Sequence, residues 1–266
     1  MSEAPFGRRP LLVAGVEELG AYRVLRVADP DGPEPQPGQF AMLAAAERWG
    51  GGEEERPYLP RAFSIARRSH GESHFLLEDI GPGTERLCEL RAGDAIWSLG
   101  PLGRGFTAPG DGRRAILVGG GVGIAPLAIL QDVLEGSVTV LLGFRDREHA
   151  QGAALLDGAR VASDDGSVGH RGLVTELLAA DIERDPEAVV YACGPAGMLE
   201  GVRALCERSG TPAQLALEAG MACGFGACFG CVVPKRGGGY LRVCVDGPVI
   251  DAALLDHVDE HAGAPA

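Results

Sequence analysis

The stretch Leu117-Val-Gly-Gly-Gly-Val-Gly-Ile-Ala-Pro126 joins a predicted strand, residues 115–118, to a predicted helix, residues 125–134. Glycines at such a junction allow backbone N–H groups and the helix N-terminus to approach a phosphate group. The spacing differs from the Rossmann pattern G-x-G-x-x-G, because Pro126 occupies its last position. A glycine-rich turn can also be purely structural, so this stretch indicates a nucleotide site only together with other evidence.

Strands and helices alternate after this turn. Further strands are predicted at 138–142 and 189–192, and further helices at 173–178 and 198–208. This alternation is typical of a parallel sheet with helices on its faces. A second glycine turn, Cys193-Gly-Pro195, follows the last of these strands and is expected at the same sheet edge. Cys193 would equally suit a small buried apolar position.

The part of the chain before the glycine-rich stretch has a different pattern. Short β-leaning runs, separated by Pro and Gly clusters, predict a small antiparallel barrel with strands at 22–27, 40–43, 62–66, 74–79 and 95–99. One helix is expected at 84–90 and an exposed loop at 47–55. The fold class is therefore a β barrel plus an α/β domain, with predicted domains at 1–108, 109–212 and, for a cysteine-rich C-terminal segment, 213–266.

That C-terminal segment contains the most specific motif. The order Cys223-x4-Cys228-x2-Cys231, followed later by Cys244, matches plant-type [2Fe–2S] ligation, in which iron takes thiolate ligands. A structural zinc site is the alternative, but only Cys228 and Cys231 have the spacing of a zinc knuckle. The total of seven cysteines is odd and no secretion signal is visible, which argues against a disulfide framework.

The segment Arg61-Ala-Phe-Ser64 lies on one of the predicted barrel strands. Alternation along a strand places Arg61 and Phe63 on one face and Ser64 on the other. Arginine suits a phosphate or ribityl group, Phe63 offers an aromatic face, and Ser64 offers a hydrogen bond to a ring nitrogen. A surface arginine and a core phenylalanine are the ordinary alternative.

Composition excludes some functions. The net charge is −13 and Lys235 is the only lysine, so the chain should repel nucleic acid. The longest apolar stretch, 115–130, is too short for a membrane span and is interrupted by glycines and a proline. No signal peptide is visible, and the chain is expected in the cytoplasm, away from membranes.

Taken in order, these motifs resemble those of the ferredoxin–NADP reductase superfamily. Within it, the chain is most similar to the electron-transfer subunits of class 1B dihydroorotate dehydrogenases, the PyrK family. The resemblance runs over nearly the whole chain and rests on 61–64, Gly81-Pro-Gly-Thr84, 100–106, 119–126, Ser163-Asp-Asp-Gly166, 193–195, 221–231 and Asp246-Gly-Pro-Val249. It departs from the family at Ala62, where proline is commoner, and in a longer loop at 47–55.

The resemblance implies roles for individual residues. It implies FAD binding by Arg61, Ala62, Phe63 and Ser64, with Gly83 and Thr84 at the pyrophosphate and Leu76, Leu77 and Glu78 flanking the flavin. It implies that the nicotinamide side consists of Gly121, Gly123, Pro126, Cys193, Gly194 and Pro195. Ser64 and Cys193 would then be catalytic, and the metal ligands would be Cys223, Cys228, Cys231 and Cys244.

The family also implies a division of labour. Electrons would pass from the FMN of a dihydroorotate-oxidising partner subunit through the [2Fe–2S] cluster and FAD to NAD⁺, in a heterotetramer with two copies of each subunit. A related NADH-dependent ferredoxin:NADP or sulfide oxidoreductase is the alternative, because its substrate site would also lie on another chain. NAD is favoured over NADP, although Arg145 and Arg147 follow one strand and NADP enzymes use basic residues there.

Overall fold

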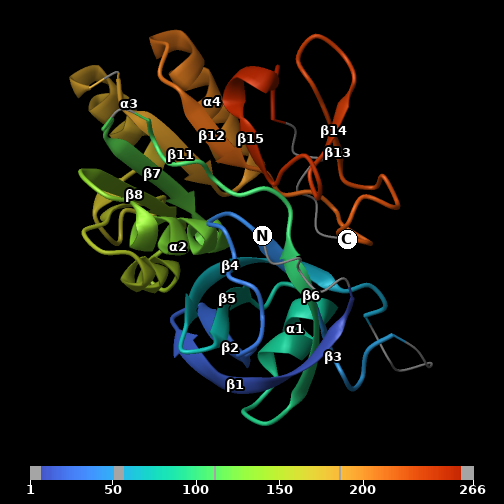
Figure 1. The fold of residues 1–266 in the computed structure, drawn as a ribbon. Coiled ribbons are helices and arrows are strands. Elements are labelled where there is room, and N and C mark those ends of the chain that lie inside the picture. The colour runs from blue at the N-terminus through green and yellow to red at the C-terminus, as the bar shows by residue number, and fades with distance from the viewer. Residues whose placement is uncertain (1–6, 51–56, 111, 186, 259–266) are drawn as a thin grey trace.

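The computed structural model describes residues 7–50, 57–110, 112–185 and 187–258 of the chain. Figure 1 shows a barrel at the bottom, an α/β sheet above it, and a C-terminal segment beside both. The expected fold class is confirmed in both parts. Most of the loop predicted at 47–55 lies outside the described residues.

Six strands close into an antiparallel barrel in the order β1-β2-β5-β4-β3-β6. Closure leaves no free sheet edge, and apolar side chains such as Leu25, Phe75 and Ile96 fill the interior. The short helix α1 adds Leu87 to this core. The bounds are β1 (Arg9–Leu19), β2 (Tyr22–Ala28), β3 (Phe40–Ala45), β4 (Arg61–Ser69), β5 (Glu72–Glu78), α1 (Pro82–Cys88) and β6 (Ala95–Leu102).

Strand β1 was not predicted from the sequence. Its apolar run contains Gly15, and among its apolar side chains only Val13 is fully buried, so alternation is weak. Pairing with β2 and β6 nevertheless makes it the strand that closes the barrel. Helix α1 begins two residues before the predicted start at Thr84, because Pro82 fits the first turn of a helix.

Seven strands form the second sheet in the order β10-β9-β8-β7-β11-β12-β15, parallel except for β15, which runs antiparallel to β12. Every residue of β7 and β11 is buried, as expected where helices cover both faces. The bounds are β7 (Ala115–Gly120), β8 (Val138–Phe144), β9 (Arg160–Ser163), β10 (His170–Arg171), β11 (Val189–Cys193), β12 (Ala213–Ala216) and β15 (Val249–Asp251).

Helices cover the two faces unequally. Side chains from α3 and α4 pack with Ile116 and Val190 on one face, whereas those from α2 pack with Leu117 and Tyr191 on the other. Helix α2 lies between the sheet and the barrel strand β4 (Figure 1). The bounds are η1 (Gly121–Ile124), α2 (Ala125–Val133), η2 (His149–Leu155), α3 (Val174–Arg184) and α4 (Ala196–Ser209). Within the described ranges, no helix is both long and apolar enough to span a bilayer.

The C-terminal segment contributes strands to the main sheet. Its strands β12 and β15 extend the main sheet, and only the hairpin of β13 (Val232–Pro234) and β14 (Tyr240–Arg242) stands apart; η3 (Ala252–Leu254) follows β15. The four sheet strands β9, β10, β12 and β15 were not predicted, because strands of two to four residues carry no readable alternation. The domain boundaries at 108/109 and 212/213 stay predictions.

A buried tyrosine holds the connector between the two domains. The hydroxyl of Tyr191 donates a hydrogen bond of 3.0 Å to the carbonyl oxygen of Thr107, and its ring meets Phe106 edge-on at 5.7 Å. The side-chain amide of Gln214 donates to the same carbonyl at 3.0 Å. The connector is therefore tied to strands β11 and β12 of the sheet.

We expect Tyr191→Phe to lower the free energy of unfolding by about 1 kcal/mol, since it removes one buried hydrogen bond and retains the ring. Urea-induced unfolding followed by circular dichroism measures the change. Tyr240→Phe is the matched control, because Tyr240 is 72% exposed. Equal effects of the two changes would contradict a structural role for the buried hydroxyl.

Candidate functional site

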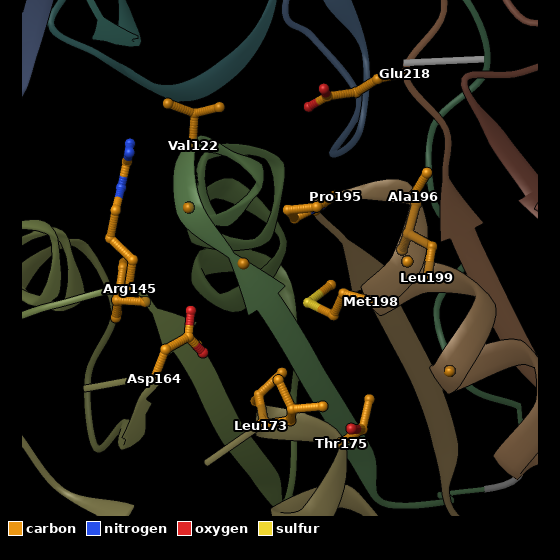
Figure 2. Close-up of a pocket in the computed structure, with 18 of the residues that line it drawn as sticks. Val122, Arg145, Asp164, Leu173, Thr175, Pro195, Ala196, Met198, Leu199 and Glu218 are labelled. Carbon is orange, nitrogen blue, oxygen red and sulfur yellow. The ribbon is translucent and has the colours of Figure 1, made fainter. Parts of the chain in front are cut away.

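The carboxyl ends of β7, β8 and β11 open into a cleft of about 710 Å³ (Figure 2). Such edges are where open α/β sheets bind their ligands. The barrel contributes Tyr22 and Glu78 to the lining, so the cleft lies at the junction of the two domains. Its walls include both glycine turns that the sequence singled out.

The two glycine turns are packed against each other. A Cβ atom at Gly123 would lie 2.6 Å from the carbonyl carbon of Cys193 and 2.6 Å from Cα of Gly194. No side chain fits there. Gly121, with a φ of 55°, and the residues Gly194 and Pro195 line the cleft. Gly123 and Pro126 are not among the lining residues: Gly123 lies behind the surface, and Pro126 is buried in the first turn of α2.

Cys193 lies at the end of β11 and is only 2% exposed. It belongs to the apolar core under the cleft and does not line the cleft itself. Burial, together with the nearby carboxylate of Glu218, raises the pKa of its thiol well above the ordinary value. Its catalytic role stays a prediction, as does that of Ser64, which is half-buried on β4.

Glu218 is a cleft residue that the sequence analysis missed. It follows β12 by two residues, and Figure 2 shows its carboxylate near Pro195 at the barrel end of the cleft. The side chain is exposed to the cleft, and desolvation by the protein around it raises the pKa of its carboxyl group. A carboxylate directly after the apolar run 215–217 was the available signal.

The predicted flavin residues meet on β4 and α1. The guanidinium of Arg61 packs over Gly83, where a Cβ atom would lie 2.6 Å from its Nε atom. Within the described residues its hydrogen bond goes to the Leu59 carbonyl at 2.7 Å, and burial lowers its pKa. The Oγ1 atom of Thr84 accepts from the N–H groups of Ile80 and Gly81. This leaves a half-buried cation, with no ion pair to a described carboxylate, at a helix start.

The other flavin residues are divided between core and surface. Phe63 packs partly against the barrel core, and Ala62 is exposed. Leu76 and Leu77 are buried in two different cores, so their side chains do not reach the cleft. Glu78 does reach it: its carboxylate pairs with Arg145 and lies 3.3 Å from Nε2 of His149.

The four cysteines form two pairs of neighbouring thiols. Cys223 contacts Cys228, and Cys231 contacts Cys244. Burial opposes ionisation of Cys223, but N–H groups of the loop, from Phe225, Cys228 and Ala227, and the Cys228 thiol lower its pKa to about 6. Burial and the Cys231 thiol raise the pKa of Cys244 to about 12.

This pairing bears on the kind of metal centre. Two pairs of thiols suit a centre with two irons, each taking two protein thiolates. Gly224 and Gly226 have φ angles of 80° and 88°, which only glycine adopts freely, so the loop can turn its N–H groups toward sulfur.

The cysteine loop also rests on the barrel. A Cβ atom at Gly224 would lie 2.5 Å from Cγ of Met42, which is buried on β3. Met42 pairs with Ala62 of the predicted flavin strand. One strand therefore separates the predicted flavin segment from the predicted cluster ligands.

Comparison with known proteins agrees with this geometry. A solved structure of an NADH-dependent reduced ferredoxin-NADP oxidoreductase matches with a TM-score of 0.79 and 24% identity, over 95% of this chain and 91% of that one. The ferredoxin reductase of carbazole 1,9a-dioxygenase matches with a TM-score of 0.65 and 24% identity, over 78% and 67% of the two chains. The fold is that of the ferredoxin reductases.

Sequence relatives define the family within this fold. The dihydroorotate dehydrogenase B (NAD(+)) electron transfer subunit of Geobacillus kaustophilus is 40% identical, over 82% of this chain and 85% of that protein. The corresponding subunit of Desulforamulus reducens is 36% identical, over 80% and 84%. The family model described as the iron-sulfur cluster binding domain of dihydroorotate dehydrogenase B matches residues 218–256, which include all four cysteines.

The chain belongs to the family of dihydroorotate dehydrogenase B electron transfer subunits. The family predicted from the motifs is thereby confirmed, and with it the oxidoreductase class and the electron-transfer role. The iron–sulfur character of the C-terminal segment is confirmed by the matching family model, which rules against a structural zinc site.

A pH-dependent stability follows from Glu218. The raised pKa means that the folded protein holds this proton more tightly than the unfolded chain does. The folded protein therefore loses stability as the pH rises from 4.5, the ordinary pKa of a glutamate, through the raised pKa of Glu218. We expect Glu218→Gln to remove this loss. The Tm of the variant minus that of the wild type should therefore be larger at about pH 8 than at about pH 4.

Thermal unfolding at the two pH values measures the difference, and Glu183→Gln on the exposed side of α3 is the control. A Tm difference independent of pH would show that the Glu218 carboxyl group is as well solvated as that of Glu183.

Proposed function

We propose that this chain carries electrons between the FMN of a dihydroorotate-oxidising partner subunit and NAD⁺, using a [2Fe–2S] cluster and FAD. The observation that supports this most is the adjacency of three sites in one chain. The cysteine loop rests on Met42 of β3, the flavin segment lies on the neighbouring strand β4, and the dinucleotide cleft reaches Glu78 of the same barrel.

The residues present fit the two resident groups. Arg61, with no ion pair to a described carboxylate, suits the pyrophosphate of FAD, since a cation favours an anion, and Gly83 lets the chain approach it without a side chain in the way. Cys223, Cys228, Cys231 and Cys244 suit the cluster. When bound, FAD exchanges hydride with NAD and single electrons with the cluster, chemistry that amino acids do not supply.

The cleft residues bind and orient the nucleotide. The glycine turns at Gly121 and Gly194 let the backbone approach its pyrophosphate, because no side chain intervenes. Glu218 lies at the barrel end of the cleft, where the nicotinamide would meet the flavin, and holds a proton more firmly than an ordinary glutamate. Cys193 supports the turn from behind.

The partner would dock at the cysteine loop. Phe225 and Phe229 stand on this loop and are 54% and 61% exposed, although both are aromatic. Exposed aromatic side chains are typical of protein interfaces. The names of the relatives, electron transfer subunits, support a separate catalytic subunit. We propose a cytoplasmic complex with two copies of each chain.

Cys231→Ser tests the ligand assignment. We expect loss of most of the bound iron and inorganic sulfide, since serine replaces a soft thiolate with a hard oxygen ligand. Cys206→Ser is the matched control, because Cys206 is a buried cysteine of α4 outside the cysteine motif. Iron analysis and the visible spectrum measure the outcome, and full iron content in the Cys231 variant would remove this cysteine from the centre.

The function itself is tested by reconstitution. Alone, the chain should pass electrons from NADH to artificial acceptors and should not oxidise dihydroorotate. With an FMN-bearing dihydroorotate dehydrogenase subunit, it should link dihydroorotate oxidation to NAD⁺ reduction. Cys231→Ser in the complex should abolish NAD⁺ reduction and spare dye reduction by dihydroorotate. Turnover of ferredoxin or polysulfide in place of dihydroorotate would favour the related oxidoreductases.

A further inference from the structure

The end of the cleft farthest from the barrel has its own lining. Asp164 directly follows β9, and Leu173 and Thr175 stand at the start of α3. Figure 2 shows these three side chains on the opposite side of the glycine turns from Glu218. A dinucleotide with its nicotinamide at Glu218 and its pyrophosphate at the glycine turns would place its adenosine here.

Asp164 presents a carboxylate that no other described group uses. Its backbone N–H donates to the carbonyl of Phe144 at 3.0 Å, which fixes the position of the residue. Within the described parts of the chain, no hydrogen bond or ion pair engages its carboxylate. The next residue differs: the carboxylate of Asp165 accepts from the N–H of Ser167 at 2.9 Å and does not line the cleft.

Two of the nearby arginines are already engaged, and a third, Arg171 of β10, lies beside Ser163 but does not line the cleft. Arg145 is the only arginine or lysine among the described residues that line the cleft, and it pairs with Glu78. Arg147 donates to the carbonyl of Ser167 at 2.7 Å and does not line the cleft. Among the described residues that line it, the adenosine end of the cleft therefore presents a carboxylate without an ion-pair partner and no unpaired cation.

We propose that Asp164 is the residue that selects NAD over NADP in this chain. Its carboxylate accepts hydrogen bonds from the free 2′- and 3′-hydroxyls of the adenosine ribose and repels a 2′-phosphate, which carries up to two negative charges. Leu173, 60% exposed, provides an apolar surface for the adenine ring. The inference rests on the proposed function, because it assumes that the cleft binds a nicotinamide dinucleotide.

The test uses two probes that carry only the adenosine end. Titration calorimetry on the purified holoprotein compares AMP with adenosine 2′,5′-bisphosphate. We expect the wild type to bind AMP more tightly. Asp164→Asn should weaken the binding of AMP by about tenfold, since it removes a charge-assisted hydrogen bond. The same change should strengthen the binding of the bisphosphate, since it removes the repulsion between the carboxylate and the 2′-phosphate. Asp165→Asn, the matched control, should change neither affinity.

Flavin reduction gives an independent measurement. The ratio of the rates with NADH and NADPH should fall at least tenfold in Asp164→Asn and stay at the wild-type value in Asp165→Asn. An unchanged ratio in Asp164→Asn, with wild-type AMP affinity, would overturn the inference while leaving the proposed function intact. Failure of the wild type to reduce its flavin with either nucleotide would instead overturn the proposed function.

Discussion

The parallel pairing of β7 with β11 is the constraint on which the rest of the site depends. Their register sets Gly119 beside Cys193, so the two glycine turns leave the sheet at the same edge. The turns then pack backbone against backbone at Gly123, too closely for any side chain. The centre of the cleft is consequently lined by main chain, which an anionic pyrophosphate can approach. The charged side chains are left at its two ends.

The barrel joins this cleft to the cysteine loop. Strand β5 delivers Glu78 to the cleft, where it neutralises Arg145. Strand β3, on the other side of β4, carries Met42 against Gly224 of the cysteine loop. All three strands belong to one closed barrel. The predicted flavin segment on β4 therefore keeps a fixed position relative to both the cleft and the cysteine loop. A rigid spacing of this kind suits electron transfer between fixed centres.

Prediction from the sequence succeeded for features whose residues lie close together along the chain. The four cysteines of the motif lie within 22 residues of one another, and their spacing alone indicated the kind of cluster. The long buried strands β7, β8 and β11 were equally readable. Prediction failed for short strands such as β9 and β15, because four or three residues carry no readable alternation. The place of Leu76 and Leu77 beside the flavin stays a prediction, with both side chains buried in core, and Glu218 lines the cleft without having been predicted.

Periodicity therefore indicated the fold class and cysteine spacing the type of metal centre, because each is encoded in residues close together along the chain, and the order of motifs along the chain carried the resemblance to the family. The charge pattern of the cleft, by contrast, required the folded chain. Whether Arg145 is free or neutralised depends on Glu78, 67 residues away, and whether Asp164 is unengaged depends on every group around it. Electrostatic pairing acts through space, so only the tertiary structure could decide which charges remain available to a ligand.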